Sequence, residues 1–272
     1  MASTARTYLA FQHNSSLHTL KAIVTSIRPF AALEEANRQL FKSGTDADHV
    51  LVTDTTIFHP QGGGQPSDVG TMTSQGGESF AVAAVRMDAV SDGQVLHFGR
   101  FTTPGTAAMF AEGDAVTQTI DVEKRLLYSR LHTAGHVLGA AVRHLLEAEV
   151  PGFDELKASH FPDAASCEFQ GVIEGKWKGP IQDKVDEYVT ANMPVEIGWW
   201  DVEDFRKRGL ERLIPDRSLV PTGEKFRVVN IVGAEVYPCG GTHVESTALC
   251  GETKVKKISR SKGTSRVSYA VN

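Results

Sequence analysis

A pair of histidines inside a long apolar stretch restricts the fold of this chain more than any other feature. Residues 122–150 read VEKRLLYSRLHTAGHVLGAAVRHLLEAEV, with apolar residues at helical spacing and a Pro-Gly pair directly afterwards. His132 and His136 are four residues apart, so on a helix they share one face. That face can present two imidazoles to a single metal ion, or it can bury both histidines in a polar core.

A second pair of potential metal ligands lies about a hundred residues later, in the string CGGTHVE. Between Cys239 and His243, the glycines Gly240 and Gly241 favour a tight turn over a helix. Thiolate and imidazole are ligands that zinc prefers. Each string alone is more often coincidental, but the two pairs together predict one site. We therefore expect Zn²⁺ to be bound by His132, His136, Cys239 and His243.

Two other interpretations of the histidine helix fit the residues less well. A zinc metalloprotease needs HExxH with a glutamate as general base, whereas Thr133 occupies that position here. His144 could be read as a third helical ligand, but we interpret it as a hydrogen-bonded histidine outside the site. Four protein ligands make a closed tetrahedral set, so catalysis requires one of them to be labile. We expect that ligand to be Cys239 or His243, because both lie on the glycine-containing loop.

The character of the sequence changes near residue 120, which predicts two domains. Before this point, short β-branched or alternating runs are separated by Gly, Asp and Ser, as is typical of a small barrel or sandwich. After it, the histidine helix and a helical run at residues 178–193 alternate with strand-like segments. The predicted fold class is α+β, with a β-barrel domain over residues 1–120 and, over residues 121–272, an α/β-mixed domain with helices and an antiparallel sheet.

Composition sets broad limits on function and location. The chain has 272 residues and a formal net charge of −5, which does not indicate a strongly basic nucleic-acid binder but leaves room for a local basic patch. Its three cysteines, Cys167, Cys239 and Cys250, are too few for a disulfide framework and indicate a reducing compartment. No apolar run approaches the ~18 residues of a membrane span, and the N-terminal residues lack the apolar core of a secretory signal. We expect a cytoplasmic protein without membrane contact.

With both ligand pairs in view, the chain resembles the alanyl-tRNA editing (AlaX) family. These proteins are freestanding relatives of the editing domain of alanyl-tRNA synthetase, and threonyl-tRNA synthetase carries a related second additional domain. The matching strings are RLHTAGH, CGGTHV and DTTIFHPQGGGQPSDVG at residues 54–70, with TIDVEKR and KGTSRVSYAV as further likenesses. The glycine segment departs from the family in having His59-Pro60-Gln61 where a Tyr-Pro-Glu-like sequence is usual. The resemblance implies the longer form of the family, with a glycine-rich N-terminal barrel before a zinc-containing editing domain.

The resemblance also implies an activity. Members of this family hydrolyse the ester between a wrong amino acid, usually serine or glycine, and the 3′ ribose of alanine tRNA. No segment has room for an ATP-dependent aminoacylation domain, so we expect no ATP and a monomeric trans-editing hydrolase. One alternative is a zinc-stabilised tRNA-binding module without hydrolytic activity. Another is an editor of a different tRNA, such as threonine tRNA, although the motifs favour the alanine branch.

Several further residues are candidates for the site. We expect Gly62, Gly63, Gly64 and Gln65 to bind the substrate, and Gln65, Thr133 and His160 to be catalytic or to line the pocket. In particular, Gln65→Ala should slow hydrolysis without changing zinc content. The alternatives are a plain glycine turn for residues 62–64 and ordinary helix packing for Thr133. Cys167 and Cys250 are expected to be structural.

A local basic patch near the C-terminus is the candidate tRNA-binding surface. A solvated charged face is the ordinary meaning of such a run, but an RNA substrate favours contacts to phosphates. The predicted tRNA-binding residues are Lys254, Lys256, Lys257, Arg260, Lys262 and Arg266.

Overall fold

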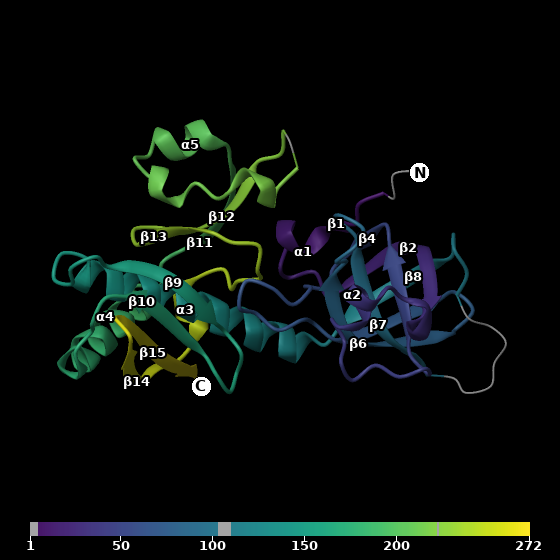
Figure 1. The fold of residues 1–272 in the computed structure, drawn as a ribbon, viewed down its shortest axis with the longest axis horizontal. Helices are drawn as coiled ribbons and strands as arrows, with labels where there is room; N and C mark the ends of the chain where they lie inside the picture. The colour runs from purple at the N-terminus through teal and green to yellow at the C-terminus, as the bar shows by residue number, and fades with distance from the viewer. Residues whose placement is uncertain (1–4, 103–109, 222) are drawn as a thin grey trace. The chain divides into compact units, whose positions relative to one another are not determined.

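The computed structural model describes residues 5–102, 110–221 and 223–272. The chain divides into two compact units (Figure 1). We call Met1–Gly62 with Pro66–Leu126 the barrel unit, and Gly63–Gln65 with Leu127–Asn272 the C-terminal unit.

The barrel unit is built on a closed barrel of antiparallel strands. In the order of their pairing, the strands are β2 (Thr19–Pro29), β3 (His49–Thr53), β7 (Val95–Phe101), β6 (Ser79–Met87), β5 (Gly70–Ser74) and β8 (Ala115–Ile120). The smaller elements are β1 (Tyr8–Leu9), which pairs in parallel with β4 (Thr55–Thr56), the helices α1 (Ala10–His13) and α2 (Glu35–Arg38), and the 3₁₀ turn η1 (Phe30–Ala32).

Alternation along the strands fills the barrel. In β8, Val116, Gln118 and Ile120 are buried while Thr119 between them is exposed, as the period of two in a strand requires. Gln118 is a polar residue inside the barrel, and its side-chain N–H groups donate to Thr53 Oγ1 at 3.1 Å and to the Thr55 carbonyl at 2.9 Å. Such interior polar groups are tolerated because each has a partner.

A buried ion pair holds the beginning of helix α3 (Val122–Leu146) to the barrel unit. Arg125 Nε lies 3.1 Å from both carboxylate oxygens of Asp68, and the guanidinium also donates to the carbonyls of Ser15 and Ile57. Both side chains are almost fully buried. Loss of one partner would leave an uncompensated charge, which costs about 3–5 kcal/mol in comparable pairs.

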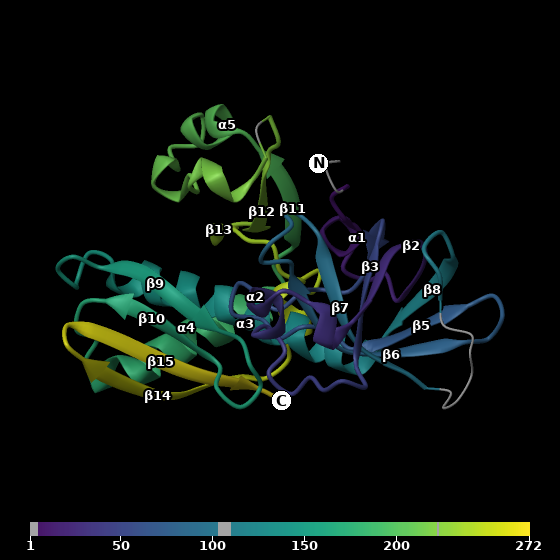
Figure 2. The ribbon, with the colours of Figure 1, turned by 45° about the vertical axis from the view of Figure 1, so that its right-hand side comes forward.

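The C-terminal unit contains two sheets and most of the helical residues. The larger sheet has the strand order β14 (Thr253–Ser261), β15 (Thr264–Val271), β10 (Ser166–Gln170) and β9 (Asp154–Ser159), all antiparallel (Figure 2). The smaller sheet has the order β11 (Val195–Trp200), β12 (Phe226–Ile231) and β13 (Glu235–Pro238). The remaining elements are α4 (Lys178–Thr190), α5 (Val202–Arg206), η2 (Gly175–Trp177), η3 (Glu211–Leu213), η4 (Arg217–Leu219) and η5 (Thr247–Cys250).

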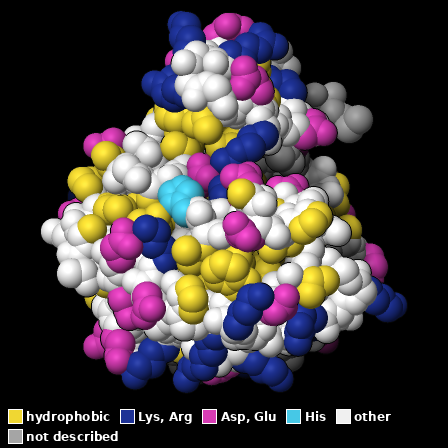
Figure 3. Space-filling model, turned by 90° about the vertical axis from the view of Figure 1, so that its left-hand side faces the viewer, with side chains coloured by type: hydrophobic (Ala, Val, Ile, Leu, Met, Phe, Trp, Pro, Cys, Tyr) yellow, Lys and Arg dark blue, Asp and Glu magenta, His cyan; other side chains and the backbone are white. Residues whose placement is uncertain are grey.

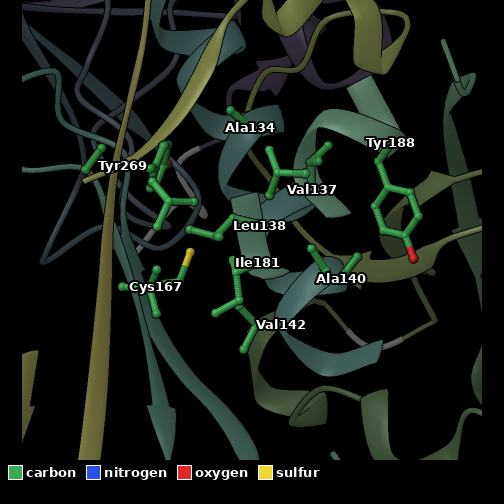
Figure 4. Packing of buried hydrophobic residues seen from close by; sticks show 14 of the residues in the cluster. Ala134, Val137, Leu138, Ala140, Val142, Cys167, Ile181, Tyr188 and Tyr269 are labelled. Carbon is green, nitrogen blue, oxygen red and sulfur yellow. The ribbon is translucent and has the colours of Figure 1, made fainter. Parts of the chain in front are cut away.

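Helix α3 lies in the middle of the core of this unit. Every residue from Leu131 to Arg143 is buried. Figure 4 shows apolar side chains of α3 facing Ile181 and Tyr188 of α4 and Cys167 of β10. A helix buried on all sides is expected to be apolar all round, so polar residues within it require specific partners.

The predicted α+β fold with an N-terminal barrel is confirmed. The compact units differ in detail from the expected domain ranges 1–120 and 121–272, because Gly63–Gln65 groups with the second unit and α3 begins in the first. No helix in the described ranges is both long enough and apolar enough to cross a membrane.

Candidate metal centre and its pocket

The expected ligands meet in the C-terminal unit. One side-chain atom from each of His132, His136, Cys239 and His243 lies within 4.8 Å of the other three. Cys239 Sγ is 3.3 Å from His132 Nε2 and 3.9 Å from His243 Nε2. A tetrahedral ion with bonds of about 2.0–2.3 Å would separate its ligands by roughly 3.5 Å, so these spacings suit a shared ion.

Gln65 determines which nitrogen of His132 faces the other ligands. Its Oε1 accepts the Thr242 N–H at 3.0 Å, and its Nε2 donates to Thr242 Oγ1 at 2.8 Å, which fixes the orientation of the amide. Because Oε1 can only accept, His132 Nδ1, 2.7 Å away, must carry the proton. The lone pair of Nε2 is therefore left for a metal ion, an arrangement common among metal-binding histidines.

Gly241 allows the loop of Cys239 to lie against His132. A Cβ atom at Gly241 would be 2.3 Å from His132 Cε1 and 2.8 Å from Gln65 Oε1, which is closer than van der Waals contact permits. The second glycine of CGGTH is thus required by the close approach of backbone and imidazole rather than by the turn alone.

The other two imidazoles are buried with nitrogens that lack partners. His136 is 9% exposed and His243 is 6% exposed, and within the described residues the Nδ1 atom of each has no hydrogen-bond partner. Burial, with nearby positive charge as a smaller cause, holds the pKa of both imidazoles well below the usual value. They are therefore neutral at pH 7, which is the form that binds metals.

The thiol of Cys239 completes the donor set. Burial raises its pKa, while the Gly241 N–H and the Arg227 guanidinium act in the opposite direction. Arg227 also donates a hydrogen bond to the Cys239 carbonyl, which holds the loop in place. A bound cation would favour the thiolate far more strongly than either group. Three neutral imidazoles and one thiol within reach of one another therefore fit a tetrahedral transition-metal ion.

A pocket of about 340 Å³ opens beside these ligands. His132, His136 and Cys239 form part of its wall, whereas His243 does not line it. The remaining lining comes from one glycine of the GGGQ segment and from α3, β9, β10 and the end of β13: Gly63, Gly135, Glu155, Leu156, Lys157, Ala158, His160, Cys167, Glu168, Phe169, Tyr237, Pro238 and Gly240.

His160 lines the pocket and packs against one of the expected ligands. Its ring stacks on His132 with 4.1 Å between centroids, and its Nδ1 lies 2.7 Å from the Tyr269 hydroxyl. Its backbone N–H donates to the Gly64 carbonyl at 2.8 Å, so the glycine segment runs alongside it. Burial lowers the pKa of His160 to about 4, which makes the ring neutral at pH 7.

Comparison with known proteins supports the expected family. Residues 226–268 match the threonyl and alanyl tRNA synthetase second additional domain. The chain is 30% identical to the alanyl-tRNA editing protein AlaX-L of Pyrococcus horikoshii over 87% of its own length. The chain is thus similar to alanyl-tRNA editing proteins. Alanine–tRNA ligases from Methanosphaera stadtmanae and Methanosarcina mazei are 32% and 30% identical, each over 82% of this chain.

The chain spans only part of these relatives. The alignments cover 55% of the P. horikoshii editing protein, 24% of the M. stadtmanae ligase and 23% of the M. mazei ligase. The matched segment includes Cys239, His243, β14 and the part of β15 up to residue 268, while His132 and His136 precede it.

Two polar residues expected to contact the substrate, Gln65 and Thr133, do not line the pocket. Gln65 is 0% exposed and is absent from the pocket lining, because its amide is bonded to His132 and Thr242. Thr133 is also 0% exposed, and its hydroxyl donates to the Ser129 carbonyl at 2.9 Å and accepts the Val244 N–H at 3.1 Å. Both side chains therefore use their polar atoms inside the protein.

Of the other residues expected at the substrate site, some line the pocket and some do not. Gly63 and His160 line the pocket. Gly62 belongs to the barrel unit and is exposed, whereas Gly64 contacts β9 and His160. His144 is bonded to the Tyr188 hydroxyl, away from the ligands, as the sequence interpretation proposed.

Sequence reasoning missed three polar residues at the site. Thr242 lies within the CGGTH string and could have been assigned a supporting role from its position between two ligands. Tyr269 lies in the terminal string KGTSRVSYAV, which had been noted only as a likeness. No local pattern marks Glu155, which lines the pocket from β9 and pairs with Arg143 at 2.9 Å.

The predicted RNA-binding residues lie together on the β14–β15 hairpin and its turn, and all six are exposed. Figure 3 shows Lys and Arg side chains along one edge of the face it presents. Two of the six have side-chain partners within the described residues: Lys254 pairs with Glu252 at 2.8 Å, and Arg266 Nε donates to Ser166 Oγ at 2.8 Å. The hairpin therefore offers a concentrated positive surface on a net-acidic protein.

Proposed function

We propose that this chain hydrolyses misacylated alanine tRNA at a zinc site, with the serine ester as its main substrate and the glycine ester as a second one. The observation that carries the proposal is the placement of His132, His136 and Cys239 in the wall of a pocket of about 340 Å³. A purely structural site would have no need of such a pocket. The names of the relatives supply the substrate class.

Different residues of the site would bind the metal ion and contact the substrate, as ester hydrolysis requires. His132, His136, Cys239 and His243 would hold the zinc ion, which when bound would polarise the ester carbonyl and lower the pKa of a water molecule. Leu156, Phe169 and Tyr237 would contact the apolar parts of the acceptor end and exclude bulk water.

Of the two loop ligands, Cys239 borders the pocket and His243 does not. Cys239 is also partly exposed, whereas His243 is buried. We therefore assign Cys239 as the loop ligand that adjoins the substrate.

The β14–β15 hairpin would contact the phosphates of the tRNA. Lys256, Lys257, Arg260 and Lys262 are exposed and have no ion-pair partner within the described residues. Replacing Lys257 with Ala should weaken tRNA binding for every sequence and lower the salt dependence by about one charge. Folding stability should change by less than ~0.5 kcal/mol, because the side chain is exposed.

Deacylation assays with serine-, glycine- and alanine-charged alanine tRNA test the function directly. We expect rapid hydrolysis of the serine ester, slower hydrolysis of the glycine ester and little of the alanine ester. His144→Ala serves as a matched control, because His144 shares helix α3 but bonds to Tyr188. Tight tRNA binding without hydrolysis of any ester would instead favour the alternative of a zinc-stabilised binding module. The free thiols fit a reducing compartment, and we place the activity in the cytoplasm.

A further inference from the structure

An editing pocket must distinguish serine from alanine by a single hydroxyl group. Discrimination of this kind is strongest when the site supplies a polar atom that only the hydroxyl can satisfy. The inference that follows rests on the proposed function and concerns which residue supplies that atom.

Two of the three polar residues expected at the pocket, Gln65 and Thr133, have their polar atoms engaged within the protein. The Gln65 amide makes hydrogen bonds to His132 and Thr242, and the Thr133 hydroxyl makes hydrogen bonds to the Ser129 carbonyl and the Val244 N–H. Neither residue lines the pocket.

His160 differs from both because one of its nitrogens is still available. The Tyr269 hydroxyl donates to the Leu131 carbonyl at 2.9 Å, and a carbonyl can only accept. The single hydroxyl proton is thereby used, so Tyr269 must accept from His160 Nδ1–H at 2.7 Å. His160 is consequently held as the tautomer whose Nε2 is a hydrogen-bond acceptor.

The surroundings of His160 are shaped to keep this arrangement. A Cβ atom at Gly135 would lie 2.5 Å from His160 Nδ1 and 2.6 Å from the Tyr269 hydroxyl. A Cβ atom at Gly64, where φ is +79°, would lie 3.2 Å from His160 Cδ2 and only 2.4 Å from the Ala158 carbonyl oxygen. A glycine from the HTAGH string and a glycine from the GGGQ string thus both leave room around one imidazole.

We propose that His160 Nε2 accepts a hydrogen bond from the side-chain hydroxyl of the serine ester and that Tyr269 is the positioning residue that keeps Nε2 unprotonated. His160 lines the pocket, is 2% exposed, and its Nε2 has no hydrogen-bond partner within the described residues. A seryl group satisfies this acceptor, whereas an alanyl group leaves it unpaired in a closed complex. The structure in this way protects correctly charged alanine tRNA.

Binding of non-hydrolysable ligands tests this assignment independently of catalysis. The probes are the seryl and alanyl amides of 3′-amino-3′-deoxyadenosine, titrated calorimetrically into the metal-loaded full chain. We expect the wild type to bind the seryl amide about tenfold to a hundredfold more tightly than the alanyl amide.

Variants of His160 distinguish the effect of its acceptor nitrogen from that of its aromatic ring. His160→Phe keeps an aromatic ring against His132 but removes the acceptor, so the preference for the seryl amide should disappear. His160→Gln retains an acceptor and should restore part of the preference. Metal content and thermal unfolding of each variant establish that the site and fold remain.

Tyr269→Phe tests the positioning role. Removal of the hydroxyl frees the tautomer, so the ¹⁵N chemical shifts of His160 should move toward a mixture of tautomers, and the seryl preference should fall severalfold. Unchanged ¹⁵N shifts would overturn the role of Tyr269. An undiminished seryl preference in a folded, metal-loaded His160→Phe protein would overturn the role of His160.

The test also distinguishes this inference from the proposed function. A protein that prefers the seryl amide but hydrolyses no charged tRNA would support the hydroxyl acceptor and contradict the hydrolase. A His160→Phe protein that hydrolyses seryl-tRNA with unchanged selectivity would support the hydrolase and contradict the role of His160 as the hydroxyl acceptor.

Discussion

Buried histidines of the barrel unit and of the C-terminal unit look alike by burial but differ in their hydrogen bonds. His97 of β7 is 0% exposed, with Nε2 2.8 Å from Thr56 Oγ1 and Nδ1 3.1 Å from the Leu51 carbonyl. His136 and His243 are nearly as buried, yet the Nδ1 atom of each lacks a partner within the described residues.

This difference in hydrogen bonding distinguishes a structural histidine from a candidate metal ligand. A buried polar atom without a partner is costly, so a folded protein keeps one only where something else supplies the missing interaction. In the barrel, Thr56 and Leu51 satisfy His97 completely. At the C-terminal site the Nδ1 atoms have no such partners among the described residues, and three imidazoles instead converge on the Cys239 thiol, with His243 Nε2 3.9 Å from its sulfur, as in a set of metal ligands.

Removal of a site histidine should have the largest effect. His136→Ala takes away one of the four ligands and should lower metal affinity by more than ~100-fold, since loss of supporting residues alone costs about 10–100-fold. Hydrolysis of seryl-tRNA should fall in parallel. Metal content by mass spectrometry and a chelator competition measure the first effect, and a deacylation assay measures the second.

The matched change in the barrel is His97→Gln, which should leave metal stoichiometry at the wild-type value. A His136→Ala protein that keeps full metal content and full activity would contradict the assignment of His136 as a ligand and its distinction from His97.

Replacing the buried glutamine of each unit, Gln65 or Gln118, should have a smaller effect than removing His136. Gln65→Leu removes the acceptor that holds His132 in its metal-binding tautomer, so metal affinity should fall by about 10–100-fold. This differs from the expectation from sequence, in which Gln65→Ala left zinc content unchanged. Gln118→Leu in the barrel removes hydrogen bonds to Thr53 and Thr55 and should reduce stability without changing metal affinity. Equal metal affinity in the Gln65→Leu and wild-type proteins would return Gln65 to a substrate role.

The pH dependence of stability should give the smallest effect. Burial lowers the pKa of His97 to about 4, while the unfolded chain keeps the ordinary value near 6.5. The unfolded state therefore binds more protons between these values, and stability falls as pH drops through 6.5 toward 4. From about pH 7.5 to about pH 5, linkage gives a loss of roughly 2 kcal/mol from this residue.

Urea unfolding of the wild type and of His97→Gln at the two pH values measures this effect. The stability advantage of the wild type should shrink by that amount at the lower pH, because only the wild type carries the titrating group. A difference that does not change with pH would show that His97 remains neutral in both states.

Residue type and spacing in the chain were enough to predict that four potential metal ligands come together. Cys239 and His243 are brought together by a turn that Gly240 and Gly241 mark, and His132 and His136 by the geometry of one helical turn. The barrel was likewise predictable, because period-two alternation and turn residues are local patterns.

Only the folded chain decided what each polar side chain in the pocket region does. Gln65 and Thr133 carry suitable groups for contact with a substrate, but they are engaged by Thr242 and Val244, which no local pattern connects to them. The tautomer of His160 likewise depends on Tyr269, which is 109 residues away in the chain. Candidate metal ligands can be recognised in short sequence motifs because metals select particular residue types. Whether a polar side chain faces a substrate or supports a neighbour depends on hydrogen bonds that form only after distant segments have packed.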